Sequence, residues 1–317
     1  MRQEAYFCTV KELDELGKNN IPRQLISHTH LIYSSPATLA FNSPGAEGFG
    51  VKRAGLAVPD SVMLIVSPGC CGRNTSVLSS MRAYQDRFYY LLMDETDIVT
   101  GRHLKKIPKA VAEICEGLKK KPSVVMICIT CVDALLGTDM ERVCHKAEEY
   151  AGVPVRPCYM YALTREGRKP PMVHVRQSVY SLLEPKKKKG NVVNLLGYFS
   201  PLTDDCELYD LLHGAGVKTI HEISRCKDYA QYQTMSEANF NLVLHPEARF
   251  AAEDFHDRLK IPYIELRRLY QIDKIASQYR ALAAALGVEF EDEIPRKAAE
   301  VAVEKFREIH PDAVFAV

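Results

Sequence analysis

The sequence lacks the features that would direct this chain to a nucleic acid or into a membrane. Its 41 lysine and arginine residues nearly equal its 40 aspartate and glutamate residues, which leaves a formal net charge of +1. Such a balance gives no broad basic surface for nucleic acid or an anionic membrane. No stretch reaches the roughly 18 uninterrupted apolar residues of a membrane-spanning helix. We therefore expect neither partner.

Two further signals are missing. Residues 1–16 carry polar side chains where a signal peptide needs an apolar core, so we expect a cytoplasmic protein. No G-x-x-x-x-G-K-[ST] motif occurs, so the chain is not expected to hydrolyse ATP itself. The composition, 47% hydrophobic and 26% charged, is that of an ordinary globular protein, and 317 residues suffice for two domains.

Cysteine, in contrast, is abundant, with ten residues in the chain. Because no export signal is present, we expect reduced thiols rather than disulfides. Some of these thiols are expected to be buried as small hydrophobic groups. Cys115 and Cys144 lie on predicted helical faces and are interpreted as structural, whereas Cys206 and Cys226 lie near predicted strand ends, where a pocket role stays open.

Short apolar runs alternate with helical periodicity in the first half of the chain. Strands are predicted at 62–66, at 124–129 and from 153, and helices from Pro108 and over 135–150. A strand, a crossover helix and a second strand are the signature of a parallel sheet.

Residues 185–190 interrupt this alternation with a proline, four lysines and a glycine. The lysine run could form a basic recognition patch, but we favour a solvated linker between a domain at 1–185 and one at 190–317. The second half repeats the pattern, with strands predicted at 191–196, 217–220, 241–244 and 261–264 and helices at 205–213, 271–286 and 294–309. The predicted fold class is α/β, with two doubly wound, Rossmann-like parallel-sheet units.

Three cysteines follow predicted strands of the first unit. Cys70 and Cys71 come after the 62–66 strand, and Cys131 comes after the 124–129 strand. In open parallel sheets, functional groups lie in the loops just beyond the carboxyl ends of the strands. Thiolates bind soft metals and iron–sulfur clusters strongly, and a cubane cluster needs four such ligands.

The spacing of these cysteines does not by itself identify the site. Cys128 and Cys131 match C-x-x-C, which also occurs in zinc sites and thioredoxin-type dithiols. However, Cys128 lies inside an apolar run and is expected in the core, and no second C-x-x-C completes a zinc tetrad. Buried structural cysteines therefore remain the alternative to a cluster.

Three segments resemble the family of nitrogenase component 1, which includes dark-operative protochlorophyllide reductase and nickel-sirohydrochlorin reductive cyclase. Residues 67–72 (SPGCCG) resemble its G-P-x-G-C cluster loop. Residues 93–101 resemble its acidic M-x-E-x-D-x-V-x-G-G stretch, and residues 130–139 its T-C-x-x-x-L-I-G-D-D motif. Further counterparts follow in order in the second unit, so the resemblance covers roughly residues 35–310.

The resemblance implies a [4Fe-4S] cluster with Cys131 as one ligand. Counting from the proline of the cluster loop places a second ligand at Cys71, and counting from the glycine places it at Cys70. The family often has a third cysteine in a segment like residues 41–46, which contain none here. Two ligands per chain imply a cluster shared between two chains, in a homodimer or a heterodimer with a related subunit; an oxygen ligand from a partner is the alternative.

Two other departures bear on function. Full-length component 1 subunits carry three Rossmann-like domains, whereas two are predicted here. His245 follows the 241–244 strand, where the nitrogenase α subunit has its cofactor cysteine, and we interpret it as a candidate cofactor-binding residue or a plain loop histidine. His28 and His30 have metal-like spacing but no carboxylate partner. We predict no iron–molybdenum cofactor and no dinitrogen reduction.

The resemblance implies the catalytic component of a two-component reductase. An ATP-dependent iron–sulfur reductase partner would supply electrons for a small unsaturated or tetrapyrrole-like substrate. Asp94 and Glu95 would then be docking or supporting groups rather than acid–base catalysts. The alternatives are a non-catalytic scaffold or carrier of a metallocofactor, and a metal-free α/β binding protein.

Overall fold

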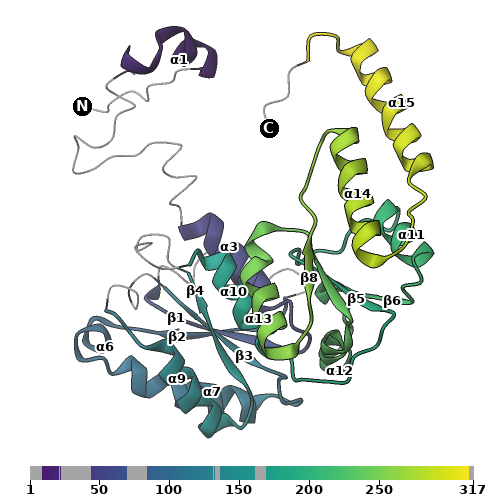
Figure 1. The fold of residues 1–317 in the computed structure, drawn as a ribbon. Coiled ribbons are helices and arrows are strands. Elements are labelled where there is room, and N and C mark those ends of the chain that lie inside the picture. Colours follow the sequence, from purple (N-terminus) through teal and green to yellow (C-terminus); the bar gives the residue numbers. More distant parts are fainter. Residues whose placement is uncertain are drawn as a thin grey trace.

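The chain forms two four-stranded parallel sheets, with strand orders β2-β1-β3-β4 and β6-β5-β7-β8 (Figure 1). This computed structural model describes residues 9–20, 22, 44–69, 84–130, 132, 136–160 and 169–313. The predicted fold class of two Rossmann-like α/β units is confirmed. Within the described ranges, no helix combines the length and apolarity that crossing a bilayer requires.

The first sheet lies between two layers of helices. Its strands are β1 (Val62–Ser67), β2 (Phe88–Leu92), β3 (Val125–Ile129) and β4 (Val155–Tyr159). The helices of this part of the chain are α1 (Val10–Leu16), η1 (Lys18–Asn20), α3 (Pro44–Gly55), α6 (Glu95–Thr100), α7 (His103–Gly117), α9 (Met140–Ala151) and α10 (Pro171–Tyr180).

The central strands β1 and β3 are buried at every position. This matches their uninterrupted apolar sequences, because both faces of a parallel sheet are covered. Met63 and Ile65 of β1 belong to the core beneath α3 and α10, whereas Leu64 and Val66 belong to the core beneath α7 and α9. The alternation of side chains along a strand thus divides β1 between two cores.

The second unit repeats this arrangement. Its strands are β5 (Val192–Leu196), β6 (Thr219–His221), β7 (Phe240–Val243) and β8 (Tyr263–Glu265). Its helices are α11 (Glu207–Gly214), η4 (Ile223–Arg225), α12 (Tyr229–Gln233), η5 (Thr234–Glu237), η6 (Pro246–Ala248), α13 (Arg249–Leu259), α14 (Ile272–Leu286) and α15 (Glu293–Ile309).

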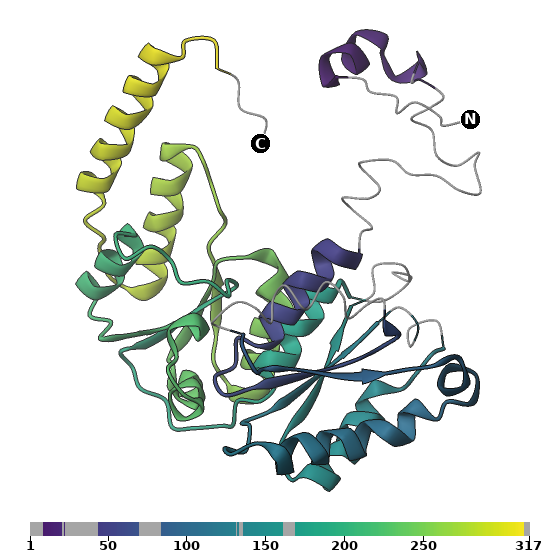
Figure 2. The same ribbon diagram turned by 180° about the vertical axis from the view of Figure 1, so that it is seen from behind.

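The two units share one continuous core, which passes between α10 and α13 (Figure 2). The rings of Tyr180 and Phe255 meet edge to face there, 5.3 Å apart. Arg258 donates a hydrogen bond to the carbonyl oxygen of Tyr180 at 3.0 Å. The lysine run lies in the segment between α10 and β5, where Lys188 donates to the carbonyl oxygen of Ser236 at 2.6 Å.

Two helices, α7 and α9, start five residues from their predicted positions. Helix α7 begins at His103, so Pro108 lies inside it rather than in its first turn. Helix α9 begins at Met140, because the Asp139 side chain accepts a hydrogen bond from the backbone N–H of Arg142 at 3.1 Å. Its predicted stop at Gly152 is confirmed, with a left-handed φ of 61°.

Candidate functional site

The first candidate site lies at the carboxyl edge of the first sheet. Strands β1 and β3 are parallel neighbours, with Val66 paired to Ile129, so both chain segments leave the sheet at the same edge. Cys70 and Cys71 follow β1 in the sequence, and Cys131 follows β3. These three predicted ligands lie outside the described residues, as do His28 and His30.

Two buried hydroxyl groups mark this edge. Ser67 ends β1 and Thr130 follows β3, and both side chains are fully buried. Neither hydroxyl oxygen has a hydrogen-bond partner among the residues that the structure describes. By strand alternation, both side chains lie on the face covered by α3 and α10. An unpaired buried hydroxyl is costly, and a group with acceptor sulfur atoms would satisfy it, so this edge fits an iron–sulfur cluster.

The acidic segment beside this edge has a structural role. Asp94 caps α6 by accepting a hydrogen bond from the backbone N–H of Asp97 at 2.7 Å. The Asp97 carboxylate is 1% exposed and binds Lys106 at 2.6 Å and Arg102 at 2.7 Å. Hydrogen bonds from these two cations hold the pKa of Asp97 well below its usual range. Asp97 is therefore a permanent anion rather than a proton donor.

His245 lies two residues after the end of β7, at the carboxyl edge of the second sheet. Its Nδ1 accepts a hydrogen bond from the backbone N–H of Glu247 at 3.3 Å, which in the neutral ring leaves the proton on Nε2. Burial lowers the pKa of His245, and the nearby charges of Arg176 and Arg268 lower it further. The ring is thus neutral at pH 7, and its role as a cofactor-binding residue stays a prediction.

A glycine brings the turn after β5 against this histidine. Gly197 has a φ of +132°, and a Cβ there would lie 2.7 Å from both the backbone nitrogen and the Cβ of His245. The next residue, Tyr198, packs edge to face against the His245 ring, with centroids 5.6 Å apart. Only glycine fits this close approach without displacing the neighbouring turn.

An arginine from the first unit holds the same two turns. Arg176 of α10 is 4% exposed, and its Nη2 donates to the carbonyl oxygen of Gly197 at 2.7 Å. Its Nη1 binds the carboxylate of Glu247 at 2.7 Å. Because Glu247 follows His245 closely, one side chain fixes the ends of both β5 and β7.

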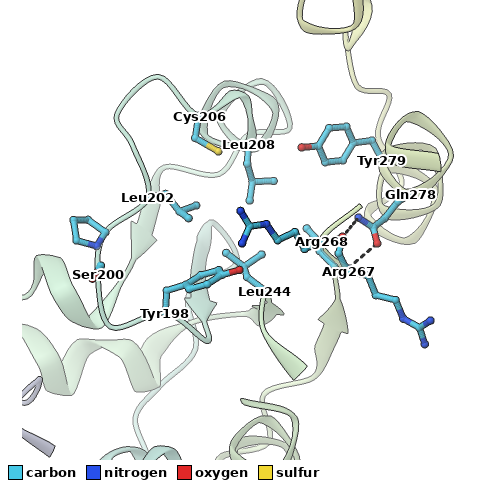
Figure 3. Close-up of a pocket in the computed structure, with 12 residues that line it drawn as sticks. Tyr198, Ser200, Leu202, Cys206, Leu208, Leu244, Arg267, Arg268, Gln278 and Tyr279 are labelled. Atoms are coloured by element: carbon cyan, nitrogen blue, oxygen red, sulfur yellow. Dashed lines mark hydrogen bonds between the residues drawn. The ribbon is translucent and has the colours of Figure 1, made fainter. Parts of the chain in front are cut away.

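A cavity of about 370 Å³ opens at this second edge (Figure 3). It is bounded by the segments that follow β5, β7 and β8 and by helix α14. Its lining residues are Tyr198, Ser200, Pro201, Leu202, Cys206, Leu208, Leu244, Leu266, Arg267, Arg268, Gln278 and Tyr279. Ligand sites in open α/β folds occur at this edge, where the strand order reverses.

The cavity combines leucine walls with a cationic end. The Arg268 side chain points inward between Tyr198 and Leu208 (Figure 3). Cys206 lines the cavity, but burial and the surrounding carboxylates raise the pKa of its thiol, so it is protonated and a poor metal ligand as it stands. The sequence analysis left a pocket role open for Cys206, which lines the cavity, and did not name Arg268 or Tyr198.

The other cysteines among the described residues are structural. Cys128 of β3 and Cys158 of β4 are register partners and fully buried, which confirms the predicted core position of Cys128. Cys144 is buried on α9, and Cys115 packs at the edge of the same core. Burial raises the pKa of Cys226 to about 11, and this residue does not line the cavity.

The described residues contain no group of three or more histidine, cysteine, aspartate or glutamate side chains placed to hold a metal ion. His245 is therefore not part of such a set within those residues.

Comparison with known proteins relates the chain to one family. The family model for nitrogenase component 1 type oxidoreductases matches residues 47–313. Among solved structures, "Nitrogenase Cp1 at pH 6.5" superposes with a TM-score of 0.63 over 88% of this chain and 64% of that chain, at 17% identity. At that identity the likeness concerns the fold alone.

The curated relatives carry the name of cofactor biosynthesis proteins. The nitrogenase iron-molybdenum cofactor biosynthesis protein NifE of Nostoc sp. is 27% identical over 239 residues, 73% of this chain and 49% of its own. The protein of the same name from Klebsiella pneumoniae is 26% identical over 297 residues, 84% of this chain and 64% of its own. The chain thus spans less than two thirds of the length of these relatives.

Proposed function

Because the chain belongs to the nitrogenase component 1 type oxidoreductase family, matched over residues 47–313, we propose that it is a cluster-binding scaffold or carrier of a metallocofactor. The observation that carries this proposal is the adjacent ends of β1 and β3, with Val66 paired to Ile129. Parallel strands deliver their following loops to one edge, so the cysteines after both strands can share one cluster.

The proposed cluster is a [4Fe-4S] cubane bound by Cys131 and Cys71, or Cys70 in its place. Each chain supplies two thiolates, and a second identical or related chain supplies the other two. When bound, such a cluster supplies one-electron redox chemistry. The hydroxyls of Ser67 and Thr130 support this placement, because they are buried without a partner in the described part of the chain.

A scaffold fits the second edge better than an enzyme does. The curated relatives that match over both sheets carry the name of cofactor biosynthesis proteins. The cavity offers leucine walls, an arginine and a neutral histidine nearby, groups that bind and orient a cargo. His245 would contact that cargo from the rim through its Nε2–H.

The test is anaerobic reconstitution of the full chain, with iron and protein quantified together. A cubane shared by two chains predicts about two iron atoms per chain. Cys131→Ser should remove most of the iron and the brown absorbance, whereas Cys115→Ser, a half-buried thiol on α7, should retain both. Wild-type protein without iron after reconstitution would contradict the proposal and favour a metal-free binding protein.

A specific observation also favours the reductase as a second candidate. Leu92 at the end of β2 is 60% exposed, and Val99 on the adjoining α6 is 84% exposed. Exposed apolar side chains beside a proposed cluster suit a docking site for an ATP-dependent iron–sulfur reductase. The enzyme would be favoured if such a reductase transferred electrons to the chain and substrate turnover followed. Val99→Asp should then slow the electron transfer. Release of an intact cluster to an acceptor protein without turnover would favour the scaffold.

A further inference from the structure

The cavity at the second edge has a cationic end without a counter-ion. Arg268 points into the cavity (Figure 3), and no carboxylate pairs with it in the part of the chain that the structure describes. Its guanidinium carbon lies 5.7 Å from the centroid of the Tyr270 ring, a contact that leaves the N–H donors at the edges of the guanidinium plane available. A guanidinium presents paired N–H donors that match the two oxygens of a carboxylate.

The backbone that carries Arg268 is fixed in place. The N–H of the preceding residue, Arg267, donates to Oε1 of Gln278 at 2.7 Å. Nε2 of Gln278 donates back to the Arg267 carbonyl oxygen at 3.0 Å. This pair of bonds ties the segment after β8 to α14. A binding group that is already positioned loses less entropy when a ligand arrives.

The rest of the cavity selects for an apolar body. Leucine side chains from four segments line it, namely Leu202, Leu208, Leu244 and Leu266. Its volume of about 370 Å³ is near the lower end of small-molecule sites. A ring as large as a tetrapyrrole would extend beyond it, whereas a small aromatic or branched aliphatic group would be enclosed.

The opposite wall disfavours highly charged anions. Asp204 and Asp205 precede helix α11 and Glu207 is its first residue, so three carboxylates are close in sequence to the lining residue Cys206. Glu207 accepts a hydrogen bond from the lining residue Tyr279 at 2.8 Å, so a carboxylate lies directly behind the wall. A phosphate dianion would be repelled by this group more strongly than a single carboxylate would.

We propose that the cavity binds a small organic monoanion, with its carboxylate on the Arg268 guanidinium and its apolar body among the leucines. The inference names the ligand class of the cavity and rests on the proposed function in treating the cavity as a cargo or substrate site. The lowered pKa of His245 agrees with it, because burial, and after it the neighbouring cations, leave that ring neutral and able to donate a hydrogen bond.

Calorimetric titration of the full chain with matched probes tests the inference. Phenylacetate supplies the carboxylate and the apolar body, phenylacetamide lacks only the charge, and inorganic phosphate lacks the apolar body. We expect phenylacetate to bind about tenfold more tightly than the amide, since a charged hydrogen bond is lost. Phosphate should bind more weakly than either. Equal affinity for acid and amide, tightest binding by phosphate, or no binding of phenylacetate would overturn the proposal.

Neighbouring arginines provide matched variants. Arg268→Gln should abolish the preference for acid over amide. Arg267→Gln should keep it because, although Arg267 is one of the lining residues, its side chain extends away from the others (Figure 3). Equal effects of the two substitutions would indicate general surface charge and overturn the assignment. Iron content after reconstitution should be unchanged in Arg268→Gln. Loss of iron in the wild-type chain would instead indicate failure of the proposed function.

Discussion

The carboxyl edges of the two sheets have the same strand order but different surroundings. At the first edge, β1 and β3 end in buried hydroxyls, and the candidate cluster cysteines follow in the sequence. At the second edge, the strands lead into a cavity with an arginine pointing inward. One topology therefore provides an edge with two buried hydroxyls and an edge with a cavity.

The carboxyl edge of the second sheet also depends on the first unit. Arg176 comes from α10, which covers the first sheet, yet its hydrogen bonds fix the turns after β5 and β7. Among the described residues, no side chain of the second unit fixes the first edge in a comparable way. We therefore expect damage to the joint between the units to affect the second edge first.

Removing Arg176 should give the largest effect. Arg176→Met leaves the Gly197 carbonyl oxygen without its donor and the partly exposed Glu247 carboxylate without its buried partner, so the free energy of unfolding should fall by about 3 kcal/mol. Urea denaturation of the metal-free chain measures this. Arg249→Met, which removes an exposed ion pair with Glu253, should cost less than about 1 kcal/mol. Similar losses in both variants would mean that the first unit does not organise the second edge.

A smaller loss is expected at the glycine of the same joint. Gly197→Ala places a Cβ 2.7 Å from the backbone of His245 at a positive φ, so the free energy of unfolding should fall by roughly 2 kcal/mol. Gly190→Ala is the control, because a Cβ there meets nothing within 4 Å. Gly197→Ala should also weaken phenylacetate binding, because the next residue, Tyr198, lines the cavity. Unchanged unfolding would show that the two turns can separate at little cost.

Much of the fold could be predicted because its signals are local. The uninterrupted apolar sequences of β1 and β3 indicate by themselves that these strands are buried. Gly152 ends α9 through its own left-handed backbone conformation. Cys128 could be assigned to the core for the same reason. The start of α7 could not be predicted, because Pro108 in a helix interior is tolerated only where packing of that helix offsets the lost hydrogen bond.

The cavity could not be predicted because it is assembled from distant segments. Tyr198, Leu244 and Arg268 follow three different strands, and only their sheet order brings them together. The rule that ligands bind beyond strand ends indicates the right edge but not which of its side chains point inward. Arg176 lies farther still, on a helix of the other unit, and no pattern in its own segment indicates its partners.

Acid titration tests the role of Asp97, which lies beside the carboxyl edge of the first sheet. The pKa of Asp97 is lowered in the folded chain by Lys106 and Arg102, so its contribution to stability is present above the unfolded pKa, near 4, and is lost as the pH falls. In Asp97→Asn, unfolding should therefore depend less steeply on pH below about 5. Stability measured from pH 7 to pH 3 tests this, with Glu95→Gln on the exposed side of α6 as the control. Parallel curves for Asp97→Asn and wild type would contradict the assignment.

The smallest effect, and the most specific to the cluster, concerns the two unpaired hydroxyls. In the metal-free chain, Ser67→Ala or Thr130→Val removes an unsatisfied buried group, so the free energy of unfolding should rise by about 1 kcal/mol. In the reconstituted protein the same change removes a hydrogen-bond donor to cluster sulfur. It should then lower the midpoint potential, on the order of 40 mV for one such bond, because donors stabilise the reduced, more negative cluster.

Ser61→Ala separates this effect from a general loss of serine at the sheet. Ser61 precedes β1 at the opposite edge, and its hydroxyl accepts a hydrogen bond from Arg87 at 2.8 Å. Its removal should reduce stability and leave the potential unchanged, the reverse of both expectations for Ser67. If Ser67→Ala also destabilised the metal-free chain, its hydroxyl would have a partner without the cluster. The hydrogen bonding at the carboxyl edge of the first sheet would then be satisfied without a cluster. In that case the hydroxyls would no longer support a cluster there.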